Sequence, residues 1–327
     1  MKNKLFLLIS LTLVIVLVLS FGCKTKTATE GEKQENNELR VAYSSNGYDY
    51  SFIVDLAEKK GFFKENGVKI KKVRTIKDTV ALVMGGQADV MIQILASSVS
   101  AYLNNQDLVW IANTANYPTF NVVSRVPKEK IATAKSFAVA RVGGSAHLVL
   151  YAALASAGVD PAKIKFISAA EDPPKVALLE KGQVDLAHLR SNTIRKLPKN
   201  KYYVIPAEKL FASTLAPRGI VTKKSFLKTK SKQIQGFVKA IYQALQLIRS
   251  DRKQALAFLK SEYKLSGKGA SDVYNGWVKA TDDLNFTPNK EMLLDTLPAI
   301  KKIAKPSNAN KDLSGYIDTK FAEEAQK

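Results

Sequence analysis

The feature that most constrains the fold of this 327-residue chain is an internal repeat. Residues 80–90 and 176–186 share the order Val-Ala-Leu, three further residues, Gly-Gln, an apolar residue, Asp and another apolar residue. This spacing predicts a short helix, a glycine that ends it and then a buried strand, because glycine readily adopts the left-handed conformation that closes a helix.

The two copies also match upstream of this motif. Each begins with an apolar strand, continues through a helix that ends at a glycine, and adds a second strand before the motif. Coincidence between two ordinary α/β segments is the alternative, and the shared order favours a repeat. Each half therefore reads strand–helix–strand–helix–strand, which predicts a mainly parallel sheet flanked by helices. The strands are 39–43 and 137–141, the helices 52–60 and 146–157, and the second strands 68–73 and 164–168.

The chain turns helical beyond about residue 223. Apolar residues in 231–249 recur on one helical face, as in an amphipathic helix packed on a core. Residues 220–221 predict a strand, and the segments 116–123 and 214–219 predict two passages of the chain between lobes. Further helices are expected at 252–263, 270–282 and 290–304.

The N-terminus has the features of an export signal. Two lysines precede an apolar run from residue 5 to residue 21, and Gly22-Cys23 closes it. Cys23 is the only cysteine, and the segment 19–23 is similar to a bacterial lipobox, whose cysteine is acylated. A signal segment whose cysteine is not acylated is the alternative. We expect 1–22 to be a signal segment and 23–38 a flexible polar tether.

The charge balance is strongly basic, with 50 Lys and Arg against 29 Asp and Glu. Such a field favours anionic ligands or surfaces, although lysines spread through every segment also suit a solvated surface. We expect no nucleic-acid partner for an exported chain.

Several blocks of sequence occur in an order that resembles one protein family. They are residues 39–43, 57–68, 81–90, 143–145, 157–161 and 221–223, the last followed by an amphipathic helix. In this order they resemble the nitrate/sulfonate/taurine-binding proteins of ABC transporters, a family that includes binders of thiamine-pyrimidine precursors.

The resemblance implies a type II periplasmic-binding fold, which is an α/β fold of two lobes joined by two hinge segments. Residues 39–118 and 217–327 would form lobe one, and 119–216 lobe two. It also implies a binding protein that delivers a small molecule to an ABC permease. Together with the N-terminal segment, this predicts a monomeric, extracytoplasmic protein that is anchored to the membrane through a lipid. Closure around the ligand would be a hinge motion.

The ligand is expected outside the carboxyl ends of the strands, where helix N-termini also point. The anionic candidates are a sulfonate, nitrate or taurine, and an aromatic or pyrimidine-like solute is the alternative. The predicted ligand-binding residues are Ser44, Ser45, Asn46, Tyr48, Lys77, Gln93, Ser97, Asn116, Tyr117, Gly143, Gly144, Ser145, His147, Asp172 and Arg190.

Several of these residues have a structural alternative. Gly143, Gly144 and Ser145 suit an approaching anion, but a plain helix cap after a glycine turn would use the same residues. Arg190 could hold an anion with its forked donors or form a salt bridge within the protein. Aromatic residues such as Tyr48 could stack on a planar ring or simply pack.

An enzyme is not expected. The sequence has two histidines, no cysteine in its body and none of the HExxH, P-loop or Gly-x-Ser-x-Gly patterns. No cofactor or metal is predicted, since metal ligands at usable spacing are missing. A periplasmic enzyme or a sensor on the same fold remains the alternative of another class.

Overall fold

The computed structural model describes residues 38–44, 48, 50–76, 78–198, 200–212 and 214–327. The predicted signal segment 1–22 and Cys23 lie outside the described residues. So does the predicted tether, apart from Glu38, which begins the first strand.

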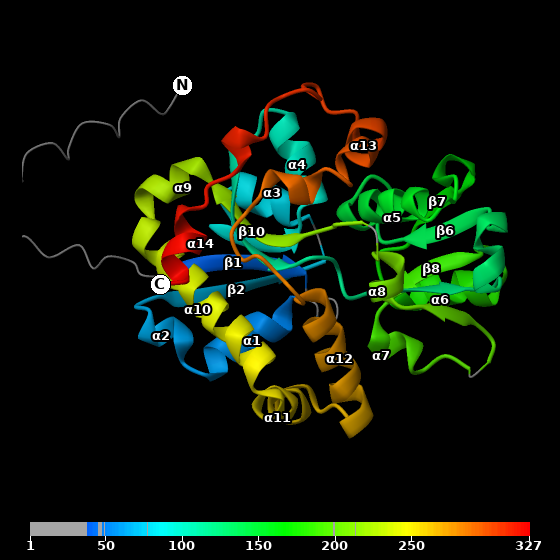
Figure 1. Ribbon diagram of the computed structural model, residues 1–327, viewed down its shortest axis with the longest axis horizontal. Helices are drawn as coiled ribbons and strands as arrows, with labels where there is room; N and C mark the ends of the chain where they lie inside the picture. The colour runs from blue at the N-terminus through cyan, green and yellow to red at the C-terminus, as the bar shows by residue number, and fades with distance from the viewer. Residues whose placement is uncertain (1–37, 45–47, 49, 77, 199, 213) are drawn as a thin grey trace, which may run out of the picture. The chain divides into compact units, whose positions relative to one another are not determined.

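Five strands form a first mixed sheet, with β2, β1 and β3 parallel to one another and β10 antiparallel between β3 and β4 (Figure 1). Apart from the lysine-rich edge strand β2, their apolar runs are buried on both faces, as expected for a sheet covered by helices on both sides. In spatial order the strands are β2 (Lys69–Thr75), β1 (Glu38–Ser44), β3 (Val90–Ile94), β10 (Arg218–Lys223) and β4 (Leu108–Ala115).

A second sheet of five shorter strands lies in the other lobe. Its β6 is parallel to both β7 and β8, and β5 is antiparallel to β8 and to β9. In spatial order the strands are β7 (Lys165–Ser168), β6 (Ser136–Val139), β8 (Leu186–Leu189), β5 (Asn121–Ser124) and β9 (Tyr203–Ile205).

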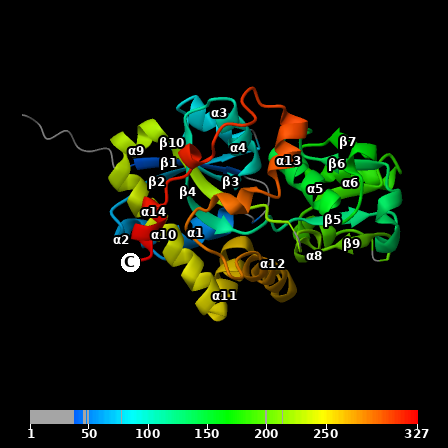
Figure 2. The same cartoon turned by 45° about the horizontal axis from the view of Figure 1, so that its top comes forward.

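The two sheets repeat one connection pattern. The first copy runs β1, α1, β2, α3, β3 and pairs in the order β2-β1-β3; the second runs β6, α5, β7, α6, β8 and pairs as β7-β6-β8. They remain separate sheets, as Figure 2 also shows. The expected two-lobed α/β fold is therefore confirmed. The helices of the repeat are α1 (Ser51–Lys59), α3 (Thr79–Met84), α5 (Ser145–Ser156) and α6 (Asp172–Glu180).

The first sheet has helices on both faces. Val41 and Tyr43 of β1 belong to a buried cluster with residues of α1 and α10, whereas Ala42 between them belongs to a cluster with Val99 of α4. This alternation is the period of a strand, with successive side chains on opposite faces. The flanking helices are α2 (Phe62–Glu65), α4 (Ala96–Leu103), α9 (Lys224–Thr229), α10 (Ser231–Ser250), α11 (Arg252–Tyr263) and α14 (Lys320–Ala325).

The aspartate of the repeated motif has the same structural task in both copies. Asp89 Oδ2 accepts the backbone N–H of Arg40 at 2.8 Å, and Asp185 Oδ2 accepts that of Lys135 at 2.8 Å. Each aspartate precedes the third strand of its copy and binds the start of the first, at the edge of the sheet away from the carboxyl ends. The motif thus joins two strands and is not part of a ligand site.

The C-terminal helices agree with the predicted segments except at 290–304. There the structure has a 3₁₀ turn at Lys290–Leu293, then α13 (Leu297–Ala299) and a π-turn at Ile300–Ala304. The single helix was wrong because Pro298 has no N–H to donate and fits only the first turn of a helix, so a new helix begins there. Among the described residues, none of the helices has the length and apolar character needed to cross a bilayer.

Candidate functional site

Two chain segments connect the sheets and lie side by side. Ala216 N donates to Asn116 O at 3.0 Å between them. Beside this connection the lobes enclose a cavity of about 30 Å³, which holds no more than one water molecule. An open hollow of about 310 Å³ adjoins it and shares Thr119, Ser191, Asp272 and Gly276. The small cavity is lined by Tyr48, Thr119, Arg190, Ser191, Asn192, Asp272, Val273, Gly276 and Trp277.

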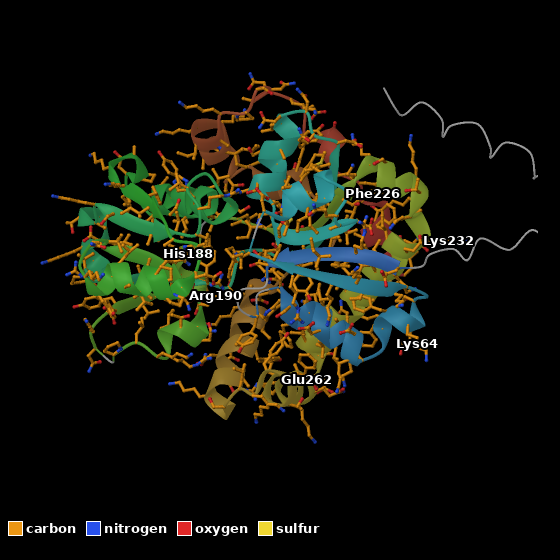
Figure 3. The ribbon with its side chains drawn as sticks, turned by 180° about the vertical axis from the view of Figure 1, so that it is seen from behind. Lys64, His188, Arg190, Phe226, Lys232 and Glu262 are labelled. Carbon is orange, nitrogen blue, oxygen red and sulfur yellow. The ribbon has the colours of Figure 1, made fainter. Side chains whose placement is uncertain are left out.

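The wall in the second lobe is a buried polar network around Asp172. Lys175 Nζ and Arg190 Nη1 both donate to Asp172 Oδ1, at 3.0 and 2.7 Å. The other oxygen accepts the backbone N–H of Arg190 and the hydroxyl of Thr193. Asp172 therefore holds Arg190 in place at the end of β8, where Figure 3 shows it close to His188. The short α7 (Ser191–Ile194) continues from Arg190.

This network carries a net positive charge. Burial alone would raise the pKa of Asp172, but the charges of Lys175 and Arg190 outweigh burial and lower the pKa to about 2. Burial lowers the pKa of Lys175 to about 8, so it is largely protonated at pH 7. Burial and both cations hold the pKa of His188 well below its usual range, which keeps its ring neutral. Two cations thus face one carboxylate.

The wall in the first lobe is aromatic and also contains a buried cation. Arg218 is fully buried, and its guanidinium lies 4.4 Å from the ring centre of Trp277 and 5.7 Å from that of Tyr50. A guanidinium over an aromatic face is attracted by the negative face of the ring. Trp277 belongs to α12 (Gly267–Ala280), and Tyr48 stacks on Tyr263 with ring centres 4.6 Å apart. The cavity therefore lies between an aromatic wall backed by Arg218 and a wall that presents Arg190.

The Gly143–Ser145 loop contacts the other lobe. Gly143 has φ +80°, a left-handed conformation that favours glycine, and its N–H donates to His147 Nδ1. Ser145 makes no capping bond to its own helix. Its hydroxyl instead donates to Ile94 O or Ser97 Oγ, at 3.1 and 2.7 Å, and accepts the N–H of Ser97. The predicted cap is thus replaced by a contact between the lobes.

The other predicted site residues are dispersed. Gln93 is buried and accepts the hydroxyl of Thr79, and His147 is buried against Phe166. Asn116 donates to Asp282 O, while Tyr117 lines the open hollow. Ser44 ends β1 and Gly144 precedes α5. Ser45, Asn46 and Lys77 lie outside the described residues. Tyr48, Tyr117 and Arg190 are the predicted residues that the structure places around the adjoining cavities.

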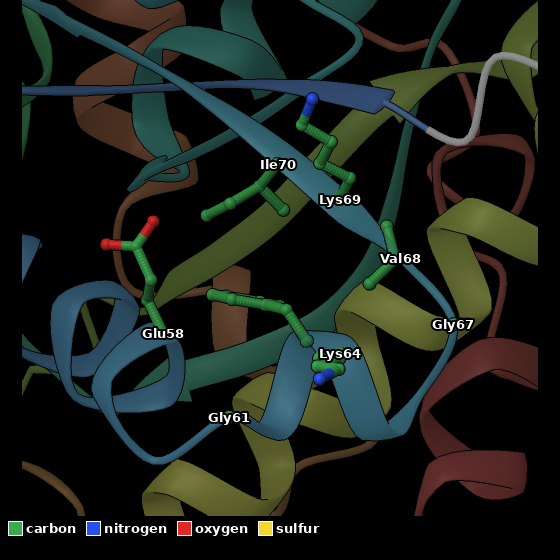
Figure 4. A pocket seen from close by; sticks show the side chains of 8 residues that line it. Glu58, Gly61, Lys64, Gly67, Val68, Lys69 and Ile70 are labelled. Carbon is green, nitrogen blue, oxygen red and sulfur yellow. The ribbon is translucent and has the colours of Figure 1, made fainter.

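A larger hollow of about 490 Å³ lies elsewhere, between α1, α2 and β2 of the first lobe. Figure 4 shows Val68, just before β2, and Ile70 of β2 there, with Glu58, Lys64 and Lys69 around them. This hollow is remote from both arginines. Within the described part of the chain, no group of three or more His, Cys, Asp or Glu side chains could hold a metal ion.

The sequence shows a family relationship over most of its length. A family model described as NMT1/THI5 like matches residues 50–255. The chain belongs to the NMT1/THI5-like family. No curated protein matches the chain.

Solved structures share the fold of this NMT1/THI5-like chain. The aliphatic sulphonate binding protein SsuA from Escherichia coli has a TM-score of 0.64 and 17% identity, over 82% of this chain and 87% of its own. The alkanesulfonate-binding SsuA from Xanthomonas axonopodis, bound to MOPS, has a TM-score of 0.65 and 15% identity, over 83% of this chain and 94% of its own. The nitrate-binding protein NrtA from Synechocystis has a TM-score of 0.68 and 13% identity, over 89% of this chain and 88% of its own. At these identities the likeness shows the two-lobed periplasmic-binding fold.

Arg218, Trp277 and Lys175 are among the residues at the site of this NMT1/THI5-like protein that were not predicted from its sequence. Arg218 and Trp277 come from segments far from the repeat, and Lys175 looks like an ordinary surface residue of α6. Arg218 does follow a proline directly and begins a strand, so its position at the passage between lobes was a usable signal.

Proposed function

We propose that this protein is the extracytoplasmic, lipid-anchored solute-binding component of an ABC importer. It captures a small anionic molecule, such as a sulfonate, nitrate or taurine, between its lobes and presents it to a permease. Residues 39–118 and 217–327 form lobe one and 119–216 lobe two, in keeping with the membership of the two sheets. The family match and the fold shared with sulfonate- and nitrate-binding proteins support this role.

The observation that carries the anionic ligand is the pair of arginines on opposite walls of one cavity. Arg190 lines the cavity and Arg218 lies on Trp277, which lines it too. Lys175 and Arg190 share the single carboxylate of Asp172, so this group of three side chains keeps one excess positive charge, and its Arg190 lines the cavity. The cavity as it stands is too small for such an anion, so the lobes must part to admit it. Between them, in a site of low dielectric constant, the anion gains more from the charge of Arg190 than it does in water.

The binding test uses calorimetry with alkanesulfonates, taurine, nitrate and a hydroxymethylpyrimidine. We expect Arg190→Gln to weaken anion binding by about 100-fold, since loss of a buried charged partner costs roughly 3 kcal/mol. Arg125→Gln is the control, because Arg125 is exposed and follows β5 at the end remote from the cavity. Equal affinity of wild type and Arg190→Gln would rule out this anion site.

A second ligand class has its own support. Tyr48 and Trp277 present aromatic surface to the cavity, which suits a planar ring such as a thiamine-precursor pyrimidine. Binding of the pyrimidine without any binding of the anions in the same calorimetric series would favour this candidate.

The lipid anchor is tested separately. Cys23 is the only cysteine, so no other thiol can carry the modification. We expect radiolabelled palmitate to enter the wild type and to be lost in Cys23→Ala when both are produced in a bacterium that makes lipoproteins. Equal labelling of the two would contradict the anchor.

A further inference from the structure

The end of the first lobe at which residues 1–37 join the fold is strongly basic. Between Glu208 and Asp251 the sequence has no Asp or Glu, and it has nine Lys or Arg. Five of these lysines fall within residues 223–232, which form the end of β10, all of α9 and the start of α10. This run is therefore a strongly basic stretch that contains no acidic residue.

The sheet register places this run beside the start of β1. Strand β10 is antiparallel to β3, so Thr222 pairs with Val90, and Val90 in turn pairs with Val41 near the start of β1. Lys230 reaches Asp89, which also binds Arg40 of β1, at 2.9 and 2.7 Å. The lysine run thus lies at the edge where the chain enters the fold at Glu38.

Neighbouring elements add charge of the same sign. Gly236 of α10 lies against the backbone of Asn66, just after α2, which brings Lys64 to the same end. Lys69 begins β2 opposite Glu38, its partner at 3.7 Å. We call the six exposed lysines at this end the basic end; they are Lys64, Lys69, Lys71, Lys224, Lys228 and Lys232. Its nearby acids are Glu38 and the exposed Glu58 and Glu65.

An aromatic side chain lies among these lysines. Phe226 of α9 is half-buried, and the ammonium group of Lys223 lies 5.1 Å from its ring centre. Figure 3 shows Phe226, Lys232 and Lys64 on one side of the first lobe. Lysines around a partly exposed aromatic ring are typical of protein surfaces that rest on lipid headgroups.

We propose that the basic end docks on anionic phospholipid headgroups of the membrane to which the chain is tethered. The six lysines match the charge of such a surface, and the covalent entry of the chain at Glu38 keeps this end near it. The surface is remote from the arginines of the cavity, so docking leaves the ligand site accessible. This docking is a property separate from solute capture, and it rests on the proposed function only in that the protein is tethered to a membrane.

The test uses the full chain with Phe226→Trp, added to vesicles that contain brominated phosphatidylcholine as a quencher. The two native tryptophans, Trp110 and Trp277, are buried and supply a constant background. We expect strong quenching of the new tryptophan when the vesicles also contain phosphatidylglycerol, and weak quenching without it. High salt should remove the difference, because screening shortens the reach of charges to roughly 3 Å at 1 M.

Charge reversal supplies the decisive comparison. Each lysine near an anionic bilayer strengthens docking by roughly fivefold. Lys224→Glu with Lys228→Glu and Lys232→Glu should therefore lower the docked fraction by about 100-fold and reduce quenching to the level of phosphatidylcholine alone. The matched control reverses three exposed lysines of the second lobe, Lys165, Lys181 and Lys196, and should quench like the wild type.

A second probe separates docking from simple attachment. Tyr203→Trp places a tryptophan on β9, where Tyr203 is 49% exposed, in the second lobe. It should stay unquenched in vesicles that quench the probe at position 226. Equal quenching with and without phosphatidylglycerol, or no effect of the charge reversal, would overturn the proposal. Ligand affinity in calorimetry reports separately on solute capture.

Discussion

Replacement of Asp172 by alanine is expected to destabilise the protein by about 3–5 kcal/mol, because it leaves two buried cations without their carboxylate. The side chain of Lys175 is fully buried and that of Arg190 is 17% exposed, so water cannot replace the lost partner. Chemical denaturation followed by circular dichroism measures the loss.

The chain contains a matched control for this variant. Glu324 and Lys327 form the same i,i+3 ion pair, but their side chains are exposed. Glu324→Ala should leave the unfolding midpoint unchanged, since exposed pairs contribute little. Adding Lys175→Met to Asp172→Ala should recover part of the loss. If Asp172→Ala unfolds like Glu324→Ala, the network does not stabilise the lobe.

Acid should remove the same contribution. The pKa of Asp172 is about 2 in the folded protein, compared with about 4 in an unfolded chain. In this range the unfolded chain binds more protons, so stability falls as pH falls. The advantage of the wild type over Asp172→Ala is complete above about pH 4 and should shrink as the pH approaches 2.

Gly219→Ala is expected to cost about 3 kcal/mol, because the first sheet has no room for a methyl group there. A Cβ at this position would lie 2.5 Å from Trp110 Nε1 and 2.8 Å from the backbone oxygen of Ala112. Trp110 is fully buried and cannot move aside. Thermal unfolding of the purified variant measures the effect.

Gly276→Ala provides the contrast. A Cβ there meets nothing within 4 Å, and the residue lies inside α12. Alanine favours a helix over glycine by about 1 kcal/mol, so this variant should be slightly more stable than the wild type. Similar losses from both substitutions would show that steric crowding at Gly219 is not the cause.

The repeat allowed the fold to be predicted from sequence, because the structures that its glycines and apolar runs favour depend on nearby residues alone. Gly61, Gly86, Gly158 and Gly182 all have φ between +66° and +81° at the ends of helices. The single helix over 290–304 failed for an equally local reason, the proline at 298. No strand was predicted at 108–115, although Leu108–Ala115 starts with five apolar residues and is buried along its whole length.

The site was harder to predict, because its walls come from segments that local patterns do not connect. The rule about carboxyl ends of strands led to Arg190, which directly follows β8. It could not lead to Trp277, whose position depends on how α12 packs against the second lobe. Nor could it show that Asp172 is bound to Lys175 and Arg190, since only the packed structure shows which charges are already matched.

The placement of Asp89 and Asp185 has a consequence for how binding specificity changes in such a protein. Both carboxylates fasten their sheets at the edge opposite the loops that meet a solute. Substitutions in those loops therefore leave these hydrogen bonds intact, and the ligand specificity can change without loss of folding. The same two-lobed fold can therefore accommodate different ligands.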